Sequence, residues 1–416
     1  MGDLPIKQLE NKTPLGAAET PNMDNLARMG KTGLMYTVSK GIAPESDVAV
    51  ISILGYDPFK YETGRGILEA VGSGMEVKNG DLALRCNFAT LGEQKQIIDR
   101  RVGRDLTTEE ALKLSQTINE QVTLKSYPAS FDFRSTIGHR AVLVIHSKAK
   151  PLSGKITNTD PAYTKIGGIG VAERNTQMTL KRCKSMDKSD EAKVSAALVN
   201  EFIQKSHALL DKHETNRNRA SKGKLKANVI LTRDAGSSLP NFFKIDERYN
   251  VRFACLADMP VEMGIGKLVG MSLIDLPPPS RDLKRDSLLR VKKLLEILPL
   301  YDCVYIHIKS PDEPGHDGNF MLKKQLIELI DENFFGELLR KINLRDYLIC
   351  VTADHSTPCM LRAHSDDPVP VLISGNKMHD DKIPKFCETD CLKGSLGVLQ
   401  KGTQLMPILM DFLKAG

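Results

Sequence analysis

The chain has 416 residues, of which 41% are hydrophobic, so two domains are expected and a largely disordered chain is excluded. The formal net charge of +6 is mild and suits an anionic small-molecule substrate, whereas the absence of Trp and an aromatic content of 5% argue against nucleic-acid binding. Eight scattered cysteines, no signal peptide and no long apolar run predict reduced thiols, a cytoplasmic location and no membrane partner.

The N-terminal part predicts a loop, a helix and a strand in that order. Residues 1–5 form the loop. The helix covers residues 20–30, because Thr20 can cap it, Pro21 suits its first position and a glycine ends it. Residues 32–38 follow as a strand.

The middle part predicts two helices and one compact strand. The first helix covers residues 106–121, with Thr107 or Thr108 as its cap and glutamates in its first turn. Residues 141–145 form the strand. Residues 190–212 show the spacing of an amphipathic helix. The basic, polar run at residues 212–227 is expected to be a solvated linker or surface turn.

The C-terminal part alternates strands with helices, which is typical of a mostly parallel sheet with right-handed crossovers. The predicted strands are residues 228–231, 302–308, 347–352 and 369–373, and the predicted helices are residues 284–298 and 321–342. We therefore expect residues 1–80 and 225–416 to form one discontinuous α/β domain. Residues 81–224 are expected to form a domain inserted into it.

Five side chains suited to metal binding lie close behind the ends of two predicted strands. They are Asp312 and His316 after the strand at 302–308, and Asp354, His355 and His364 after the strand at 347–352. Because the carboxyl ends of parallel strands share one edge of a sheet, these loops can converge. Carboxylates and imidazoles suit Mn²⁺ or Zn²⁺, and two such ions can hold a phosphoryl group between attacking and leaving oxygens.

Ser46 is the one hydroxyl in a loop bounded by Gly41 and Asp47. It can act as a helix cap, or as a nucleophile oriented and activated by a metal ion. The pattern alone leaves both roles open.

Several motifs together resemble the archaeal-type, cofactor-independent phosphoglycerate mutases of the alkaline phosphatase superfamily. They are Met1-Gly2-Asp3, Thr20-Pro21-Asn22-Met23-Asp24, Pro44-Glu45-Ser46-Asp47, Leu54-Gly55-Tyr56-Asp57-Pro58, His307-Ile308-Lys309 with residues 312–318, and Thr352 to Pro358. The resemblance covers nearly the whole chain. It implies an alkaline phosphatase-like core with a central, mostly parallel sheet flanked by helices, and an inserted α+β lid domain that closes over the substrate.

The resemblance also implies an activity and a set of ligands. The enzyme would interconvert 3- and 2-phosphoglycerate through a phosphoserine on Ser46, without 2,3-bisphosphoglycerate. One metal ion would be held by Asp312, His316 and His364. A second would be held by Asp354 and His355 and would touch Ser46. Mn²⁺ is the expected ion, with Zn²⁺, Co²⁺ or Mg²⁺ as alternatives.

Substrate binding is expected from basic residues of both domains. Arg65, Arg140, Arg233 and Lys267 are the candidates, because guanidinium and ammonium groups bind carboxylate and phosphate. Asp160 is a candidate for acid–base duty in the inserted domain. The alternatives are a related metal-dependent phosphatase or phosphosugar mutase, or an inactive truncated form.

The inactive alternative arises at the N-terminus. The family opens with a strand and Asp-Gly-Met-Gly-Asp, whose first aspartate binds metal, and Asp3 matches the last aspartate of that motif. A missing first strand is expected to expose an edge inside the central sheet.

Overall fold

A computed structural model describes residues 1–61, 64–166, 169–172, 177–280, 282–375 and 380–415. The chain forms two compact units, which we call unit 1 (Met1–Tyr61 with Phe242–Gly416) and unit 2 (Glu62–Asn241). The sequence suggested boundaries near residues 80 and 225. The boundaries of unit 2 lie before residue 62 and after residue 241 instead. Helix α4 (Arg65–Gly72) and strand β8 (Val229–Gly236) both pack on β2 (Leu82–Leu91), so these segments belong to unit 2.

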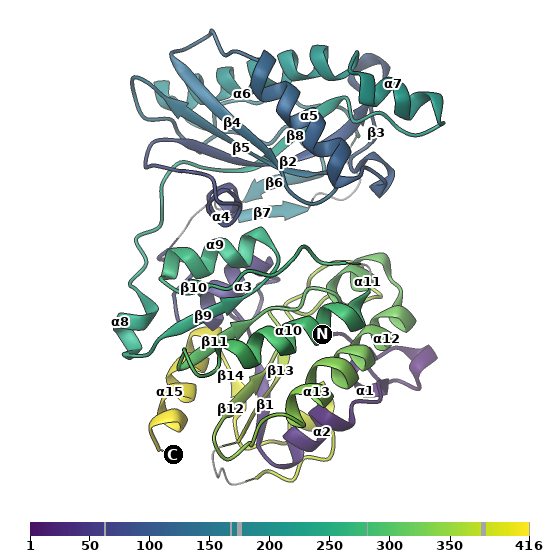
Figure 1. Ribbon diagram of the computed structural model, residues 1–416, viewed down its shortest axis with the longest axis vertical. Helices are drawn as coiled ribbons and strands as arrows, with labels where there is room; N and C mark the ends of the chain where they lie inside the picture. Colours follow the sequence, from purple (N-terminus) through teal and green to yellow (C-terminus); the bar gives the residue numbers. More distant parts are fainter. Residues whose placement is uncertain (62–63, 167–168, 173–176, 281, 376–379, 416) are drawn as a thin grey trace. The chain divides into compact units, whose positions relative to one another are not determined.

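Unit 1 contains two sheets among the described residues (Figure 1). The four-stranded sheet has the order β12-β13-β1-β14, with bounds Leu348–Val351, Val369–Gly375, Lys31–Met35 and Gly397–Leu399. Strand β1 is antiparallel to β13 and parallel to β14, and β12 is antiparallel to β13. The three-stranded sheet β10-β9-β11 is parallel throughout, with bounds Ser272–Leu273, Phe253–Leu256 and Cys303–Ile306. Unit 1 therefore contains one mixed sheet and one short parallel sheet where a single mostly parallel sheet was expected.

Helices surround these sheets. They are α1 (Pro14–Ala17), α2 (Pro21–Arg28), α3 (Ser46–Ile53), α8 (Ile245–Tyr249), α9 (Pro260–Val269), α10 (Leu283–Ile297), α11 (Asp312–Asp317), α12 (Phe320–Ile330), α13 (Gly336–Leu339), α14 (Glu388–Cys391) and α15 (Leu405–Ala415). A π-helical turn at Asp331–Phe335 joins α12 to α13. Leu294, Ile327 and Phe334 are buried together, so α10, α12 and this turn share one apolar core.

Unit 2 is built on an antiparallel sheet with the order β3-β2-β5-β4, in which β8 pairs with the other edge of β2. Its further bounds are Ile97–Asp99 for β3, Ala129–Ser135 for β4 and Arg140–Ser147 for β5. Helices α5 (Thr108–Gln121) and α6 (Asp190–Leu210) cover one face, and α4 lies against the other (Figure 1). A hairpin of β6 (Tyr163–Ile166) and β7 (Ile169–Ala172) completes the unit.

The expected helix at 106–121 is present as α5, and its start is fixed by local chemistry. The Thr107 hydroxyl accepts a hydrogen bond from the Glu110 N–H at 3.2 Å, and the Glu110 carboxylate accepts one from the Thr107 N–H at 3.0 Å. This reciprocal arrangement satisfies two N–H groups that the helix leaves open.

The prediction of a solvated linker at 212–227 was wrong for much of that run. Residues Glu214–Ser221 form α7, and Arg219 is only 1% exposed. Its guanidinium forms ion pairs with Asp105 and, at 2.7 Å, with Glu110. A single buried arginine whose acidic partners lie in a distant part of the sequence leaves no trace in the composition of a basic run, so the sequence could not reveal it.

No helix of the described ranges combines the length and the apolar content that crossing a bilayer requires.

A buried lysine ties the start of the chain to α12. The Lys323 ammonium donates to the Gly2 carbonyl at 2.9 Å, to the Asp3 carboxylate at 2.7 Å and to the Thr357 carbonyl at 2.9 Å. Both charged side chains are almost fully buried. Their mutual attraction offsets desolvation only while both are present.

We predict that Lys323→Met lowers the free energy of unfolding of unit 1 by about 3–5 kcal/mol, because Asp3 is left as a buried, unpaired charge. Native-state hydrogen exchange of α12 amides measures this loss. The control is Lys341→Met, whose ion pair with Glu337 is exposed and long at 3.9 Å, and which should change exchange little. Equal exchange in both variants would contradict the prediction.

Candidate metal and anion-binding site

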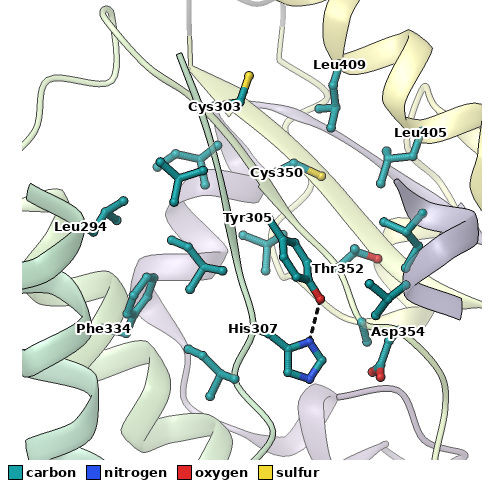
Figure 2. A pocket seen from close by; sticks show the side chains of 18 of the residues that line it. Leu294, Cys303, Tyr305, His307, Phe334, Cys350, Thr352, Asp354, Leu405 and Leu409 are labelled. Carbon is teal, nitrogen blue, oxygen red and sulfur yellow. Dashed lines mark hydrogen bonds between the residues drawn. The ribbon is translucent and has the colours of Figure 1, made fainter. Parts of the chain in front are cut away.

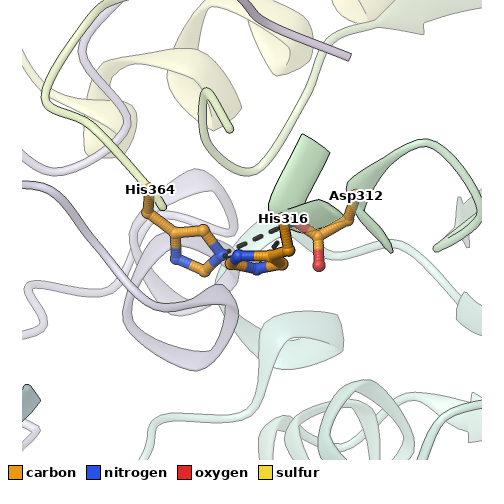
Figure 3. Close-up of side chains that lie close together, drawn as sticks. All are labelled: Asp312, His316 and His364. Atoms are coloured by element: carbon orange, nitrogen blue, oxygen red, sulfur yellow. Dashed lines mark hydrogen bonds and ion pairs between the residues drawn. The ribbon is translucent and has the colours of Figure 1, made fainter. Parts of the chain in front are cut away.

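Three of the predicted metal ligands meet in unit 1. Asp312 begins α11, and His316 follows it by one helical turn on the same face. His364 approaches from the loop after β12 (Figure 3). One ligand atom of each residue lies within 4.8 Å of the other two. The two imidazole Nε2 atoms are 3.1 Å apart, and each lies 3.5 Å from Asp312 Oδ1.

The charges of this group are coupled. Burial opposes ionisation of Asp312, but the hydrogen bond from His364 and the charge of Lys309 hold its pKa well below the usual range. Burial also opposes the charging of His364. The Asp312 hydrogen bond and the negative charge of Glu45 outweigh that effect and raise the pKa of His364. The cluster thus stabilises positive charge between its side chains.

Ser46 lies beside this group, at the start of α3, and is 1% exposed. Its Oγ is 3.0 Å from His355 Nε2 and accepts a hydrogen bond from Lys309 Nζ at 2.9 Å. Lys309 also lies 2.9 Å from Asp312 Oδ2. One lysine therefore joins the serine to the three-residue cluster. Ser46 is the first helical residue rather than the cap, so the capping role left open by the sequence does not apply.

Asp354 (Figure 2) and His355 form the second predicted pair. Asp354 Oδ2 lies 3.2 Å from His355 Nε2, yet this buried oxygen has no hydrogen-bond partner among the described residues. Burial raises the pKa of Asp354, but the charges of His355 and Lys309 hold it well below the usual range. A buried, ionised carboxylate is costly unless positive charge compensates it. The carboxylate and imidazole donors present therefore fit divalent metal ions.

Unit 2 carries a positively charged face on its central strands. Arg85 of β2 lies directly opposite Arg233 of β8, and Asn87 lies opposite Arg140 of β5. Since directly opposed residues share a face, these side chains point to the α4 side of the sheet. The 5% exposed Glu69 of α4 is 3.0 Å from Arg85 and offsets part of this charge.

Two further groups border the same arginines. Arg100 donates to Asp160 through Nε at 2.7 Å, and the Arg233 guanidinium lies 3.9 Å from the centre of the Tyr163 ring. The charge of Arg233 outweighs burial and lowers the pKa of Tyr163 to about 7. Two buried nitrogens of Arg233, Nε and Nη1, have no hydrogen-bond partner among the described residues. Arg233 Nε has a long ion pair with Asp234 at 3.8 Å, so its charge is only partly compensated. Guanidinium nitrogens without hydrogen bonds, beside further arginines, fit an anionic ligand.

The predicted residues therefore fall into two groups. Ser46 and the five metal-binding candidates come together in unit 1. Arg65, Arg140, Asp160 and Arg233 belong to unit 2, where the Arg65 Nε atom lies 3.1 Å from Glu69. Lys267 lies on α9 of unit 1 and is exposed.

Sequence reasoning missed Lys309, Arg85, Arg100 and Tyr163 as site residues. Lys309 was detectable, because it follows the same strand end as Asp312. Arg85 lies inside a strand that the sequence pattern did not predict. Arg100 and Tyr163 become neighbours of Arg233 only through the folding of unit 2.

Fold and site define a class: an α/β chain in two units, with a carboxylate–imidazole set around a buried serine and an arginine-rich face. A family model for 2,3-bisphosphoglycerate-independent phosphoglycerate mutase matches residues 27–216. The relative of that name from Aeropyrum pernix is 41% identical, over 96% of this chain and 95% of its own length. The Thermococcus kodakarensis relative is 39% identical, over 99% of this chain and 95% of its own length.

Two solved structures are also similar to this chain over nearly its whole length. One from Pyrococcus horikoshii is 31% identical with a TM-score of 0.79, covering 100% of this chain and 95% of its own. The cofactor-independent phosphoglycerate mutase from Thermoplasma acidophilum is 30% identical with a TM-score of 0.60, covering 99% and 97%. The chain belongs to the family of 2,3-bisphosphoglycerate-independent phosphoglycerate mutases, which are isomerases.

We predict that His316→Ala weakens Mn²⁺ binding at least about tenfold, because it removes one of three converging ligand atoms. Isothermal titration of the chelator-treated chain with Mn²⁺ measures the affinity. The control is His146→Ala in unit 2, where the imidazole pairs with Asp81 at 2.9 Å, and Mn²⁺ affinity should not change. Unaltered affinity in the His316 variant would show that the cluster does not bind the ion.

Proposed function

We propose that this chain interconverts 3-phosphoglycerate and 2-phosphoglycerate through a phosphoserine on Ser46, without 2,3-bisphosphoglycerate. The observation that carries the proposal is the setting of Ser46. Its Oγ is held between His355 Nε2 and the Lys309 ammonium, beside the Asp312 cluster. The names of relatives that match over nearly the whole chain support the substrate.

The metal-binding side chains would divide between two ions. Asp312, His316 and His364 would hold one, and Asp354, His355 and Ser46 would hold the other. Mn²⁺ suits this mixture of oxygen and nitrogen donors, and Zn²⁺, Co²⁺ or Mg²⁺ are alternatives. Bound ions would lower the pKa of the Ser46 hydroxyl and neutralise charge on the transferring phosphoryl group.

The reaction then takes two steps, in which the phosphoryl group moves first to Ser46 and then back to the glycerate. Ser46 gives up its hydroxyl proton as Oγ attacks phosphorus, the bond from phosphorus to the substrate O3 breaks, and O3 takes up a proton, which leaves glycerate and phosphoserine. Glycerate reorients, its O2 hydroxyl gives up a proton as it attacks the same phosphorus, the bond to Ser46 Oγ breaks, and Oγ regains a proton. Burial opposes the charged form of Lys309, but Asp312 and Asp354 outweigh it and raise its pKa, so its Nζ stays protonated. Lys309 can therefore stabilise negative charge on Oγ in both steps.

Unit 2 would bind the rest of the substrate and act as the substrate-closing domain. Arg233, Arg65 and Arg140 would contact the carboxylate or phosphate, and Lys267 would contribute from unit 1. Retaining glycerate between the two steps requires that water be excluded, since water would release free phosphate. Asp160 is ionised and paired with Arg100, because hydrogen bonds from that arginine outweigh burial and lower its pKa. It would accept a proton more readily than it would donate one.

We predict that Ser46→Ala abolishes the conversion of 3- to 2-phosphoglycerate, because no other oxygen takes the place of Oγ. The rate is followed by coupling to enolase with Mn²⁺ present and 2,3-bisphosphoglycerate absent. Ser221→Ala, at the exposed end of α7, is the control and should retain full activity. Mass spectrometry of the quenched wild-type enzyme should find phosphate on the Ser46 peptide.

Three results would overturn the proposal. Residual mutase activity in the Ser46 variant would exclude the phosphoserine route. Release of free phosphate as the main product would identify a phosphatase. No turnover by a chain that binds Mn²⁺ would identify an inactive form.

We predict that Arg233→Met lowers kcat/KM for 3-phosphoglycerate by about 10–100-fold, because a charged hydrogen bond to the substrate is worth about 1.5–3 kcal/mol. Arg217→Met is the control, since Arg217 is exposed on α7. Steady-state kinetics with a thermal melt of each variant separates lost binding from unfolding. An unchanged kcat/KM in the folded Arg233 variant would place the substrate elsewhere.

A further inference from the structure

Strand β4 forms one edge of the unit 2 sheet (Figure 1). It pairs with β5 along all seven of its residues, and among the described residues no strand lies on its other side. Such an edge presents a row of backbone donors and acceptors. A strand from another chain can therefore pair with β4 unless something closes this edge.

One side chain closes the edge at its centre. Asn119 Nδ2 donates to the Phe133 carbonyl at 2.7 Å, and Asn119 Oδ1 accepts from the Phe133 N–H at 2.9 Å. Both backbone groups of Phe133 therefore point away from β5. A neighbouring antiparallel strand would make the same two bonds to one residue. The Asn119 amide thus takes the place of that strand.

The contact can open while β4 stays in place. Asn119 lies near the end of α5 and is exposed, so water competes for both of its hydrogen bonds. Phe133, by contrast, is only 2% exposed, and its ring packs on those of Phe88 and Phe202 in the core. Displacement of the Asn119 side chain therefore uncovers an ordered strand edge.

The charges of β4 indicate which partner fits the uncovered edge. Asp132 and Arg134 flank Phe133, and their present contacts with His146 and the Ser73 carbonyl leave both exposed. If a second copy of β4 pairs antiparallel with Phe133 opposite Phe133, each Asp132 lies opposite an Arg134. Pairing Asp132 with Asp132 instead would oppose like charges, which is unfavourable. The edge is therefore complementary to itself in one register.

The backbone fits the same register. Because backbone groups alternate in direction along a strand, those of Phe131 and Ser135 point away from β5, as those of Phe133 do. In the register centred on Phe133, Phe131 of each copy lies opposite Ser135 of the other. Outward donors and acceptors of one copy therefore meet those of the second copy along the strand.

We propose that β4 is a self-association edge that Asn119 keeps closed, and that displacement of this amide lets a second copy of the chain pair antiparallel with β4, centred on Phe133. The unit 2 sheets of the two copies would then form one continuous sheet. This inference concerns unit 2 alone and stands independently of the proposed reaction.

The test compares the wild-type chain with Asn119→Ala and with a matched control, Gln116→Ala. Gln116 is also an exposed amide of α5, and Ala suits a helix at both positions. We expect Asn119→Ala to raise the dimer association constant at least about tenfold, because uncovered backbone groups gain partners in the dimer. Gln116→Ala should associate no more than the wild type. Sedimentation equilibrium over a wide range of protein concentration measures the constant.

Two further changes test the register. Asp132→Arg added to Asn119→Ala opposes like charges twice and should weaken the dimer at least about threefold. Adding Arg134→Asp as well restores opposite charges in the register centred on Phe133 and should recover association. Hydrogen exchange of β4 amides should slow as the Asn119→Ala chain dimerises. Amides of β2, inside the same sheet, are the internal control for an intact fold and should not change.

Any other result overturns the proposal. A monomeric Asn119→Ala chain with protected β2 amides would show that the uncovered edge does not pair. Loss of β2 protection would show that Asn119 holds the fold rather than closes the edge. Equal association by the wild type or by Gln116→Ala would show that Asn119 does not close the edge. Association that ignores the charges at 132 and 134 would place the contact elsewhere. None of these readouts requires metal ions or turnover, so they fail or succeed separately from the mutase proposal.

Discussion

The buried contact between Lys323 and Asp3 holds the metal-binding loops in place. Lys323 fastens α12 to the first residues and to the Thr357 carbonyl, while the Asp3 carboxylate accepts from the Cys359 N–H at 3.2 Å. The loop that carries Asp354 and His355 is thereby held directly after these two residues, at Thr357 and Cys359. Asp3 matches the last aspartate of the family motif, and its partners here give that position a structural role.

The two units concentrate charges of opposite sign: buried carboxylates in unit 1 and neighbouring arginines in unit 2. In unit 1, the pKa values of the buried Asp312 and Asp354 are held well below the usual range, so these carboxylates suit cations. In unit 2, arginines face one another across β2 and β8, so this face suits an anion. Each unit has its own buried hydrophobic core.

Local chemistry was predictable from sequence, and long-range pairing was not. The helix α5 was found because its cap and first turn lie within four residues. Strand β2 was missed because Arg85 and Asn87 interrupt its apolar pattern, and their burial depends on Glu69 and Arg233 from elsewhere. Because β2 was not predicted, the expected domain boundary near residue 80 falls inside unit 2. The metal-binding candidates could be proposed from sequence because each follows a strand end, whereas Arg100 and Tyr163 have no such position.

The distinction between a mutase and a phosphatase rests on what happens to glycerate after Ser46 is phosphorylated. In the proposed reaction, Lys309, His355 and the metal-binding candidates would act on the phosphoryl group, and they would serve a mutase and a phosphatase equally. Discrimination must come from groups that hold the leaving alcohol while water is kept out. The arginine-rich face of unit 2 would offer those groups, since two guanidinium nitrogens of Arg233 have no hydrogen bond among the described residues and suit a carboxylate. Specificity for isomerisation over hydrolysis would then lie in the inserted unit rather than in the phosphatase-like core.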